Sequence, residues 1–233
     1  MPRTPPLEWV PLVGPLSADR RDSASDDNSH PPLILLHGFT QTRGSWDSLI
    51  EVLDTRHGFD RPIIRVDLPG HGASAEVTTD LTTTAKLVTQ TCGVGVYCGY
   101  SMGGRVALHC ALASPDAVNG LVTIGATPGI DDEDERRNRL IADEILADSI
   151  ESMGVPAFIE QWLSQPMFAG LPRTQVDDAQ RLSNTAHGLA SSLRLSGTGT
   201  QRSLWSRIHE LEMPALFLAG EDDTKFATIA ERM

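Results

Sequence analysis

The serine at position 101 lies in a pattern that presents a nucleophile. Residues 99–104 read Gly-Tyr-Ser-Met-Gly-Gly, which fits the G-x-S-x-G pattern of a nucleophile elbow. An apolar segment precedes the motif and a helical pattern follows it, which is the strand–turn–helix setting that an elbow requires. Because Gly99 and Gly103 permit a sharp turn, we expect the Ser101 hydroxyl at a helix N-terminus, which favours developing negative charge. The alternative, a chance Gly/Ser turn, fits this setting less well.

Two backbone amides are expected to face that hydroxyl. His37-Gly38-Phe39 follows a short buried strand at residues 33–36. In folds with such an elbow, the oxyanion hole takes one N–H from this loop and one from the residue after the nucleophile. The backbone amides of Phe39 and Met102 are therefore the predicted donors, and the His37 side chain is expected to be structural.

An acidic pair follows the last predicted strand. Asp222 and Asp223 both lie where an acid could orient a catalytic imidazole, and one of them is expected to be a helix N-cap instead. The triad order in this setting is serine, acid, histidine. No histidine follows Asp223, so the triad histidine is absent from this chain. We expect a C-terminally truncated sequence that lacks a final strand and helix, and the alternative is a catalytically inactive protein.

Alternating strand and helix patterns indicate how these residues are positioned. They predict an α/β fold, with a mostly parallel sheet and helices on both faces. Strands are expected at residues 33–36, 63–66, 94–98, 121–124 and 215–219, of which the first two are expected to be buried. Helices are expected at residues 46–53, 81–91, 102–113 and 226–232. An opening strand within residues 7–13 precedes a polar loop at residues 17–30.

Roughly 90 residues without a strand pattern separate the fourth and fifth strands, far more than an ordinary connection. Helical patterns fill this interval at residues 132–147, 155–163, 174–183 and 188–195. We predict an inserted helical cap over the sheet edge where parallel sheets bind ligands. The expected organisation is an N-terminal strand and polar loop (1–30), a core (31–130), a helical cap (131–200) and the remaining core (201–233).

Composition excludes several classes of partner. The net charge of −12 disfavours nucleic acid, and no apolar run is long enough to cross a bilayer. The N-terminus does not resemble a signal peptide, and the three cysteines lack metal-type spacing. We expect a cytoplasmic monomer or weak homo-oligomer without metal or cofactor.

The longer motif GYSMGGR at residues 99–105, together with the cap, resembles the 2-succinyl-6-hydroxy-2,4-cyclohexadiene-1-carboxylate synthase (MenH) family of the α/β-hydrolase superfamily. LHGFTQTRGSW (36–46) and DLPGHGAS (67–74) are common to many α/β-hydrolases. The cap stretches WLSQPMF (162–168) and GLASSLRLSGTGTQ (188–201) are more specific. The resemblance implies an α/β-hydrolase fold, and GEDDTKF (220–226) favours Asp223 as the triad acid.

The resemblance also implies a reaction and a binding site. The reaction is a lyase step of menaquinone biosynthesis, in which serine-assisted proton abstraction eliminates pyruvate from 2-succinyl-5-enolpyruvyl-6-hydroxy-3-cyclohexene-1-carboxylate. Such a small tricarboxylate needs fixed positive charge. The implied substrate-binding residues are Tyr100, Arg105, Arg139, Trp162 and Arg181. Without the resemblance, the elbow allows a carboxylester or carbon–carbon bond hydrolase, and the missing histidine allows a catalytically inactive binding protein.

Overall fold

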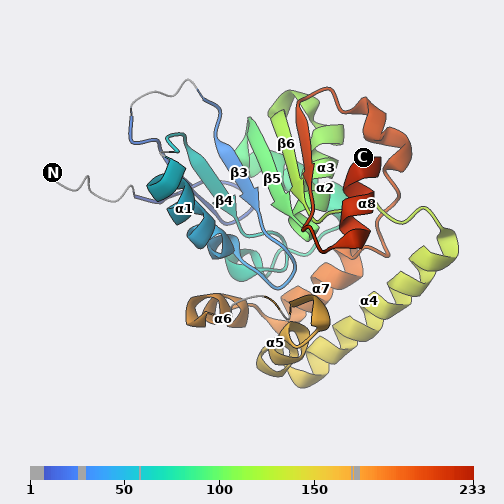
Figure 1. Cartoon of the computed structure of the whole chain (residues 1–233). Helices are drawn as coiled ribbons and strands as arrows, with labels where there is room; N and C mark the ends of the chain where they lie inside the picture. The colour runs from blue at the N-terminus through green and yellow to red at the C-terminus, as the bar shows by residue number, and fades with distance from the viewer. Residues whose placement is uncertain (1–7, 26–29, 58, 169, 171–173) are drawn as a thin grey trace.

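A seven-stranded sheet organises the part of the chain that the structure describes (Figure 1). The structure is a computed structural model and describes residues 8–25, 30–57, 59–168, 170 and 174–233. The strand order is β1-β2-β4-β3-β5-β6-β7, parallel from β4 to β7, with β1 and β2 antiparallel at one side. The strands are β1 (Val10–Pro11), β2 (Ala18–Arg21), β3 (Leu33–Leu36), β4 (Ile63–Val66), β5 (Gly95–Tyr100), β6 (Val118–Ile124) and β7 (Ala215–Leu218).

Helices cover both faces of the sheet, as predicted for an α/β fold. Alternate residues of β3 point to opposite faces. Leu36 packs in the cluster that contains Val106 and Leu108, whereas Leu35 packs with Trp46 on the other face. Figure 1 shows α1 in front of the sheet and α2 and α3 behind it. These helices, with α8 beside β7, are α1 (Asp47–His57), α2 (Leu81–Cys92), α3 (Met102–Ala113) and α8 (Thr224–Arg232).

A helical cap lies at the end of the sheet to which the parallel strands point (Figure 1). It comprises α4 (Glu133–Met153), α5 (Val155–Leu163), α6 (Gln175–Leu182) and α7 (Ala186–Ser196). The cap has its own apolar cluster, in which Phe158 and Leu189 are fully buried. Phe39, from the loop after β3, packs against both this cluster and the main core. The predicted oxyanion loop therefore lies where the cap meets the sheet.

One end of the sheet differs from the prediction and the other agrees with it. Ala18–Arg21 is a strand, although the sequence pattern predicts a polar loop at residues 17–30. Asp19 and Arg21 are buried because they have partners far along the chain: Asp19 pairs with Arg43 and Arg65, and Arg21 pairs with Asp54. The predicted strand at residues 215–219 is confirmed as β7, which lies at the edge of the sheet, where Leu216 is 52% exposed.

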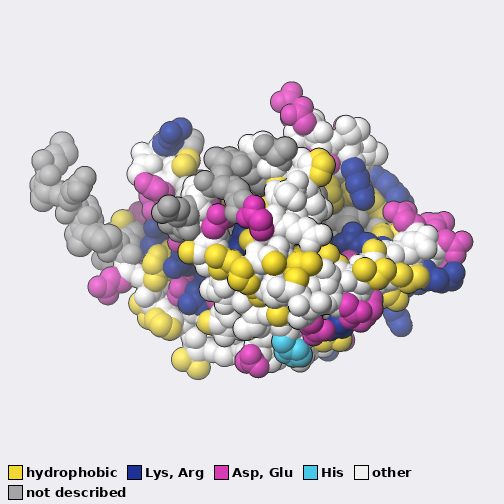
Figure 2. All heavy atoms as spheres, turned by 90° about the horizontal axis from the view of Figure 1, so that it is seen from below, with side chains coloured by type: hydrophobic (Ala, Val, Ile, Leu, Met, Phe, Trp, Pro, Cys, Tyr) yellow, Lys and Arg dark blue, Asp and Glu magenta, His cyan; other side chains and the backbone are white. Residues whose placement is uncertain are grey.

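The described helices include none that could span a membrane. Viewed from below, the molecule shows hydrophobic side chains interspersed with charged ones rather than one continuous apolar face (Figure 2). All three cysteines are buried and unpaired by disulfides, and Cys98 and Cys110 lie in the apolar clusters as expected.

Candidate active site

Ser101 lies at the sharp turn between β5 and α3, as the elbow motif predicts. Its backbone angles are φ 51° and ψ −107°, a conformation that non-glycine residues rarely adopt. The Ser101 N–H donates to the Ile124 carbonyl oxygen (2.8 Å), and the Ser101 carbonyl oxygen accepts from the Arg105 N–H (3.1 Å). The hydroxyl is half-buried and makes no hydrogen bond with the described residues. The turn thus holds a strained backbone and leaves the hydroxyl free to react.

The glycines of the elbow are required by close approach of the backbone. A Cβ on Gly99 would overlap the Gly103 carbonyl oxygen, and a Cβ on Gly103 would overlap the Leu36 carbonyl oxygen. Only glycine lets α3 start this close to β3 and β5.

Gly103→Ala should therefore destabilise the protein strongly. The added Cβ would also lie 2.5 Å from the Leu36 carbonyl carbon, so β3 or α3 must move. We expect the free energy of unfolding to fall by about 3 kcal/mol or more, as in severe overpacking. Urea denaturation measures this change. Gly120→Ala is the matched control, because its Cβ would meet only ordinary contacts at 3.5 Å or more; equal effects of the two variants would refute the close-approach argument.

The loop after β3 is held rigid by its own side chains. His37 Nε2 accepts from the Leu68 N–H (3.0 Å), so the proton is on Nδ1, which donates to the Gly38 carbonyl oxygen (2.8 Å). The Gly38 N–H donates to Gln41 Oε1 (2.8 Å). These bonds agree with a structural role for His37. The backbone amides of Phe39 and Met102 make no hydrogen bond within the described chain, so both donors remain available.

Asn184, which the sequence reasoning missed, ties the cap to this loop. Its Nδ2 donates to the Thr40 carbonyl oxygen (2.8 Å), and its Oδ1 accepts from the Gly72 N–H (2.9 Å). Thr40 itself has a positive φ of 68°. The two partners of Asn184 lie more than 100 residues away in the sequence, and such long-range hydrogen bonds produce no periodic sequence pattern that could have predicted them. Asn184 thus helps to fix the conformation from which Phe39 presents its amide.

Two fully buried histidines support the oxyanion loop in their neutral form. The rings of His37 and His71 are 5.1 Å apart, and that of Phe39 is 5.7 Å from that of His71. Burial lowers the pKa of His37 to about 4 and that of His71 to about 3. Nearby charges add smaller effects: Arg181 also lowers the pKa of His37, and His37 that of His71.

These histidines should make folding sensitive to mild acid. An unfolded histidine has a pKa near 6.5, so the unfolded state gains protons as the pH falls below that value while the folded state does not. The contribution of these histidines to the free energy of unfolding is therefore fully present above pH 6.5. Between pH 6.5 and pH 4 it declines by about 1.4 kcal/mol per pH unit for each buried histidine. Urea unfolding between pH 7.5 and 5 measures the slope. His109, whose pKa burial lowers to about 4, offers a check, because H109Q should reduce the slope; a flat profile would refute the prediction.

Aromatic side chains surround the loop that carries Phe39. The Phe39 and Trp162 rings meet edge-to-face with centroids 5.4 Å apart. Tyr100 lies under Gly38, since a Cβ on Gly38 would be 2.8 Å from the Tyr100 ring. Two predicted binding residues, Tyr100 and Trp162, therefore lie beside the loop that carries the Phe39 amide. Trp162 also packs against the apolar cluster of the cap, so it contributes to the cap as well.

Arg105 is buried without an acidic partner. It is 7% exposed, and its one hydrogen bond within the described structure is from Nη1 to Gln201 Oε1 (3.1 Å). Burial is the main reason that the pKa of Arg105 falls to about 10, and nearby Arg139 lowers it further. The guanidinium remains charged at neutral pH. Arg139 is half-exposed and donates through Nε to Asp143 Oδ1 (2.7 Å). Asp143 thus pairs with Arg139 and acts on Arg105 electrostatically without a bond to it.

Arg181 belongs to a second group of site residues. It contacts the Thr40 hydroxyl through Nη1, and the Arg181 charge acts on both Tyr100 and His37. Burial lowers the pKa of Arg181 and raises that of Tyr100. No direct interaction joins Arg181 to Arg105 or Arg139 among the described residues. The structure therefore shows Arg105 and Arg139 as neighbours and Arg181 with different partners. That all three bind one ligand stays a prediction.

Asp223 lies within electrostatic reach of Tyr100 but serves here as a helix N-cap. Its Oδ1 accepts from the Phe226 N–H (3.1 Å) at the start of α8, and its side chain is exposed. The Asp223 carboxylate is one cause of the raised pKa of Tyr100. No histidine whose side chain the structure describes bonds to Ser101 or Asp223. The choice between Asp222 and Asp223 as the acid thus stays open.

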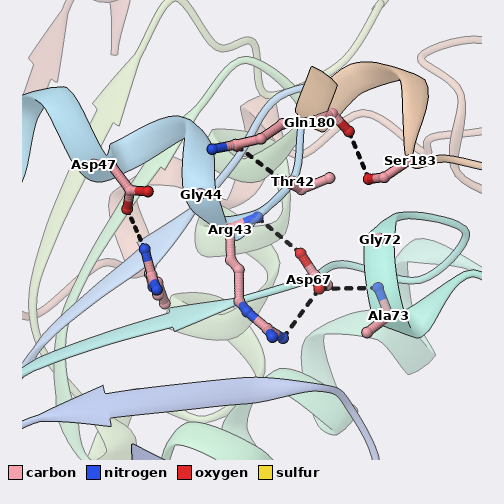
Figure 3. A pocket seen from close by; sticks show the side chains of 10 residues that line it. Thr42, Arg43, Gly44, Asp47, Asp67, Gly72, Ala73, Gln180 and Ser183 are labelled. Atoms are coloured by element: carbon pink, nitrogen blue, oxygen red, sulfur yellow. Dashed lines mark hydrogen bonds and ion pairs between the residues drawn. The ribbon is translucent and has the colours of Figure 1, made fainter. Parts of the chain in front are cut away.

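A pocket of about 410 Å³ lies apart from the elbow, between the start of α1, the end of β4 and α6 (Figure 3). Its two arginines are neutralised: Arg43 pairs with Asp67, and Arg65 pairs with Asp47 (Figure 3). Gln180 accepts from the Thr42 hydroxyl across the pocket (3.1 Å). These paired charges contrast with Arg105, which has no carboxylate partner in the described structure. Among all the residues that the structure describes, no group of three histidine, cysteine or acidic side chains is arranged to hold a metal ion.

The parallel sheet, the elbow and the oxyanion loop define an α/β-hydrolase fold. The model of the alpha/beta hydrolase family matches residues 33–233. Some solved structures share this fold at lower identity. One is a thermophilic esterase from Thermogutta terrifontis, with a TM-score of 0.74, 21% identity, and coverage of 97% of this chain and 86% of that one.

Closer relatives specify the family further. The chain is 32% identical to the 2-succinyl-6-hydroxy-2,4-cyclohexadiene-1-carboxylate synthase of Pectobacterium atrosepticum, over 86% of this chain and 81% of the relative. A Bacillus subtilis (strain 168) protein provisionally given that name is 36% identical, over 88% and 78%. The structure of MenH from S. aureus has a TM-score of 0.81 and 30% identity, with coverage of 92% and 84%. The chain therefore belongs to the 2-succinyl-6-hydroxy-2,4-cyclohexadiene-1-carboxylate synthase (MenH) family of α/β-hydrolases.

Proposed function

We propose that this protein is a lyase of menaquinone biosynthesis that eliminates pyruvate from 2-succinyl-5-enolpyruvyl-6-hydroxy-3-cyclohexene-1-carboxylate. The observation that carries the proposal is Arg105: a buried guanidinium without an acidic partner in the described structure, one helical turn from Ser101. A buried charge is stable only when it is paired. An anionic ligand supplies that pair, and a substrate with three carboxylates fits this requirement better than a neutral ester does.

The reaction moves one proton and breaks one carbon–oxygen bond. A base removes the ring proton next to the succinyl carbonyl group, and the electron pair of that C–H bond delocalises onto the carbonyl oxygen. The electrons then return through the ring and expel the enolpyruvyl oxygen. Pyruvate leaves as its enolate and takes up a proton, so the sum is one substrate converted to pyruvate and the cyclohexadiene product. No oxidant, reductant or cofactor is needed.

This chain's residues supply charge stabilisation and orientation for that step. The free backbone N–H groups of Phe39 and Met102 would donate to the carbonyl oxygen as it gains charge. Ser101 would act in the proton transfer, activated by the histidine of the family's triad, with Asp223 as the proposed acid. Arg105, Arg139 and Arg181 would bind substrate carboxylates, and Tyr100 and Trp162 would line the site.

Release of pyruvate from the menaquinone precursor tests the proposal directly. The assay uses the complete protein that the gene encodes and couples pyruvate to lactate dehydrogenase with NADH as the readout. Rapid pyruvate release with little hydrolysis of p-nitrophenyl esters supports the lyase. Fast ester hydrolysis without pyruvate release would favour the carboxylester hydrolase, and binding without turnover would favour a catalytically inactive binding protein. A small-molecule ligand, a cytoplasmic location and a monomeric or weakly associating state are parts of the same proposal.

A further inference from the structure

Gln201 is a buried amide that holds Arg105. It lies in the segment through which the chain returns from the cap to the core, and it is 2% exposed. Its Oε1 accepts from Arg105 Nη1 (3.1 Å) across 96 residues of sequence. Its Nε2 has no hydrogen-bond partner in the described structure. One half of this amide is therefore used to hold an arginine, and the other half is free.

Chemistry fixes which way the amide faces. A guanidinium group has five N–H donors and no acceptor, so only the amide oxygen can face Arg105. With that oxygen committed, the Nε2 group must point away from the arginine. A buried donor without an acceptor is costly, and most native structures avoid it. Because the orientation cannot be reversed, the free donor is a feature that needs an explanation.

The surrounding backbone holds Gln201 in place. The Leu204 N–H donates to the Pro128 carbonyl oxygen (2.8 Å), and Trp205 Nε1 donates to the Gly129 carbonyl oxygen (3.1 Å). Gly129 has a φ of 117°, and a Cβ there would lie 3.5 Å from Gln201 Nε2. The loop after β6 thus runs beside the free amide, at the end of the sheet that the cap covers. These hydrogen bonds hold the segment that carries Gln201 against the loop after β6.

The charges around Arg105 are unbalanced. Asp143, 2% exposed, is the acidic group that acts on Arg105, and both of its oxygens already have other donors. Oδ1 accepts from Arg139 Nε (2.7 Å), and Oδ2 accepts from the Gly199 N–H (3.2 Å). Asp143 therefore pairs with Arg139, and it acts on Arg105 without a bond to it. Since Arg139 is half-exposed and bonded to Asp143, Arg105 is the buried guanidinium group that has no carboxylate bonded to it in the described chain.

Glutamine at position 201 keeps that guanidinium group free of a bonded carboxylate. A glutamate there would accept the same hydrogen bond from Arg105 but would neutralise the arginine and leave no free donor. A glutamine accepts the bond, carries no charge and keeps two N–H groups. A site that binds a carboxylate needs a neutral amide here, because the isosteric acid would compete with the ligand for Arg105.

We propose that Gln201 is a positioning residue that orients Arg105 without neutralising it, and that its Nε2 gives the same ligand carboxylate a second donor. Arg105 and Gln201 form one carboxylate-binding unit. This inference rests on the proposed function, because the ligand is the polycarboxylate substrate. It adds a specificity element: an analogue that lacks this carboxylate leaves both the guanidinium and the amide unpaired.

The variant Q201E tests the proposal because it changes the charge while keeping the shape. We expect KM for the substrate to rise at least about 10-fold, the size of one lost charge-assisted hydrogen bond, with kcat changing much less. The melting temperature should stay close to that of the wild type, since the introduced carboxylate pairs with Arg105. A purely structural role predicts the opposite result, an unchanged KM, because a carboxylate holds the arginine at least as well.

Equilibrium binding keeps this test independent of turnover. The probe is 2-succinylbenzoate, a stable aromatic compound with the succinyl and ring carboxylates of the named product, measured by calorimetry. Q201E and Q201M, which removes both polar groups at similar volume, should each bind the probe at least about 10-fold more weakly. Q180E is the matched control, since it adds the same charge to a cap residue outside the proposed site.

The outcomes separate the two proposals. Weaker binding in Q201E and Q201M but not in Q180E supports the carboxylate-binding unit. Wild-type affinity in Q201E, or an equal loss in Q180E, would overturn it, and if Q201E does not fold, Q201M decides. Probe binding by a wild-type protein that releases no pyruvate would overturn the proposed reaction while leaving the role of Gln201 supported or refuted by its own variants.

Discussion

Ser101→Ala should lower kcat for pyruvate release by about 10³-fold to 10⁶-fold, the range found when a triad member is removed. The elbow places this hydroxyl at a turn with φ 51° and ψ −107°, and no described residue accepts or donates a hydrogen bond with it. Such a strained and unpartnered group has no structural reason to be serine. The rate should fall while KM changes little, because the hydroxyl acts in the proton transfer and not in holding carboxylates.

Single-turnover and steady-state pyruvate assays on the complete protein measure this effect. Ser164→Ala is the control, since Ser164 is an exposed cap serine that bonds only to the Gln161 carbonyl oxygen. Both variants should melt near the wild-type temperature. A near-wild-type rate for Ser101→Ala would remove Ser101 from the mechanism and leave the oxyanion donors and arginines as the whole of the catalytic machinery.

Local patterns predicted the sheet and the elbow well. The strands at residues 33–36 and 63–66 and the helices at 102–113 and 155–163 agree with the structure at both ends. Apolar runs define these segments, and glycine or proline residues mark their ends. Both features can be read directly from the sequence. The N-cap of α4 is also local, because Asp132 accepts from the Glu135 N–H three residues later. The α/β-hydrolase fold followed from such signals.

Long-range polar pairing could not be predicted in the same way. β2 has the sequence Ala-Asp-Arg-Arg, and it is a strand because Asp19 and Arg21 meet opposite charges 24 to 46 residues away. Asn184 and Gln201 are buried for the same kind of reason, since their partners lie 144 and 96 residues distant. Periodicity carries no information about such pairs. The polar residues that were missed are those whose partners lie far along the chain.

The arginines show the limit of a family resemblance. The resemblance implied Arg105, Arg139 and Arg181 as one set. In the structure, Asp143 pairs with Arg139 and acts on Arg105, whereas the Arg181 charge acts on Tyr100. Of the three arginines, Arg105 is the most completely buried.

Arg105→Met should weaken substrate binding strongly without destabilising the protein. KM should rise by about 30-fold to 1,000-fold, because a charged group that is buried with its ligand contributes about 2–4 kcal/mol. The free energy of unfolding should stay constant or increase by as much as about 2 kcal/mol, since the variant removes a buried charge that has no counter-charge in the described structure. Steady-state kinetics and urea denaturation of the same samples measure the two quantities.

The opposite signs of these two effects distinguish a ligand-binding arginine from a structural one. A structural arginine is stabilising, so its removal lowers stability and affects KM only indirectly. Arg137, exposed on α4 and paired with Asp134 three residues earlier, is the matched control, and Arg137→Met should change neither quantity. Arg105→Lys should recover only part of the affinity, because an ammonium group lacks the planar fork of the guanidinium. A loss of stability in Arg105→Met with unchanged KM would show that the Arg105 charge supports the fold. The argument for a tricarboxylate substrate would then lose its main support.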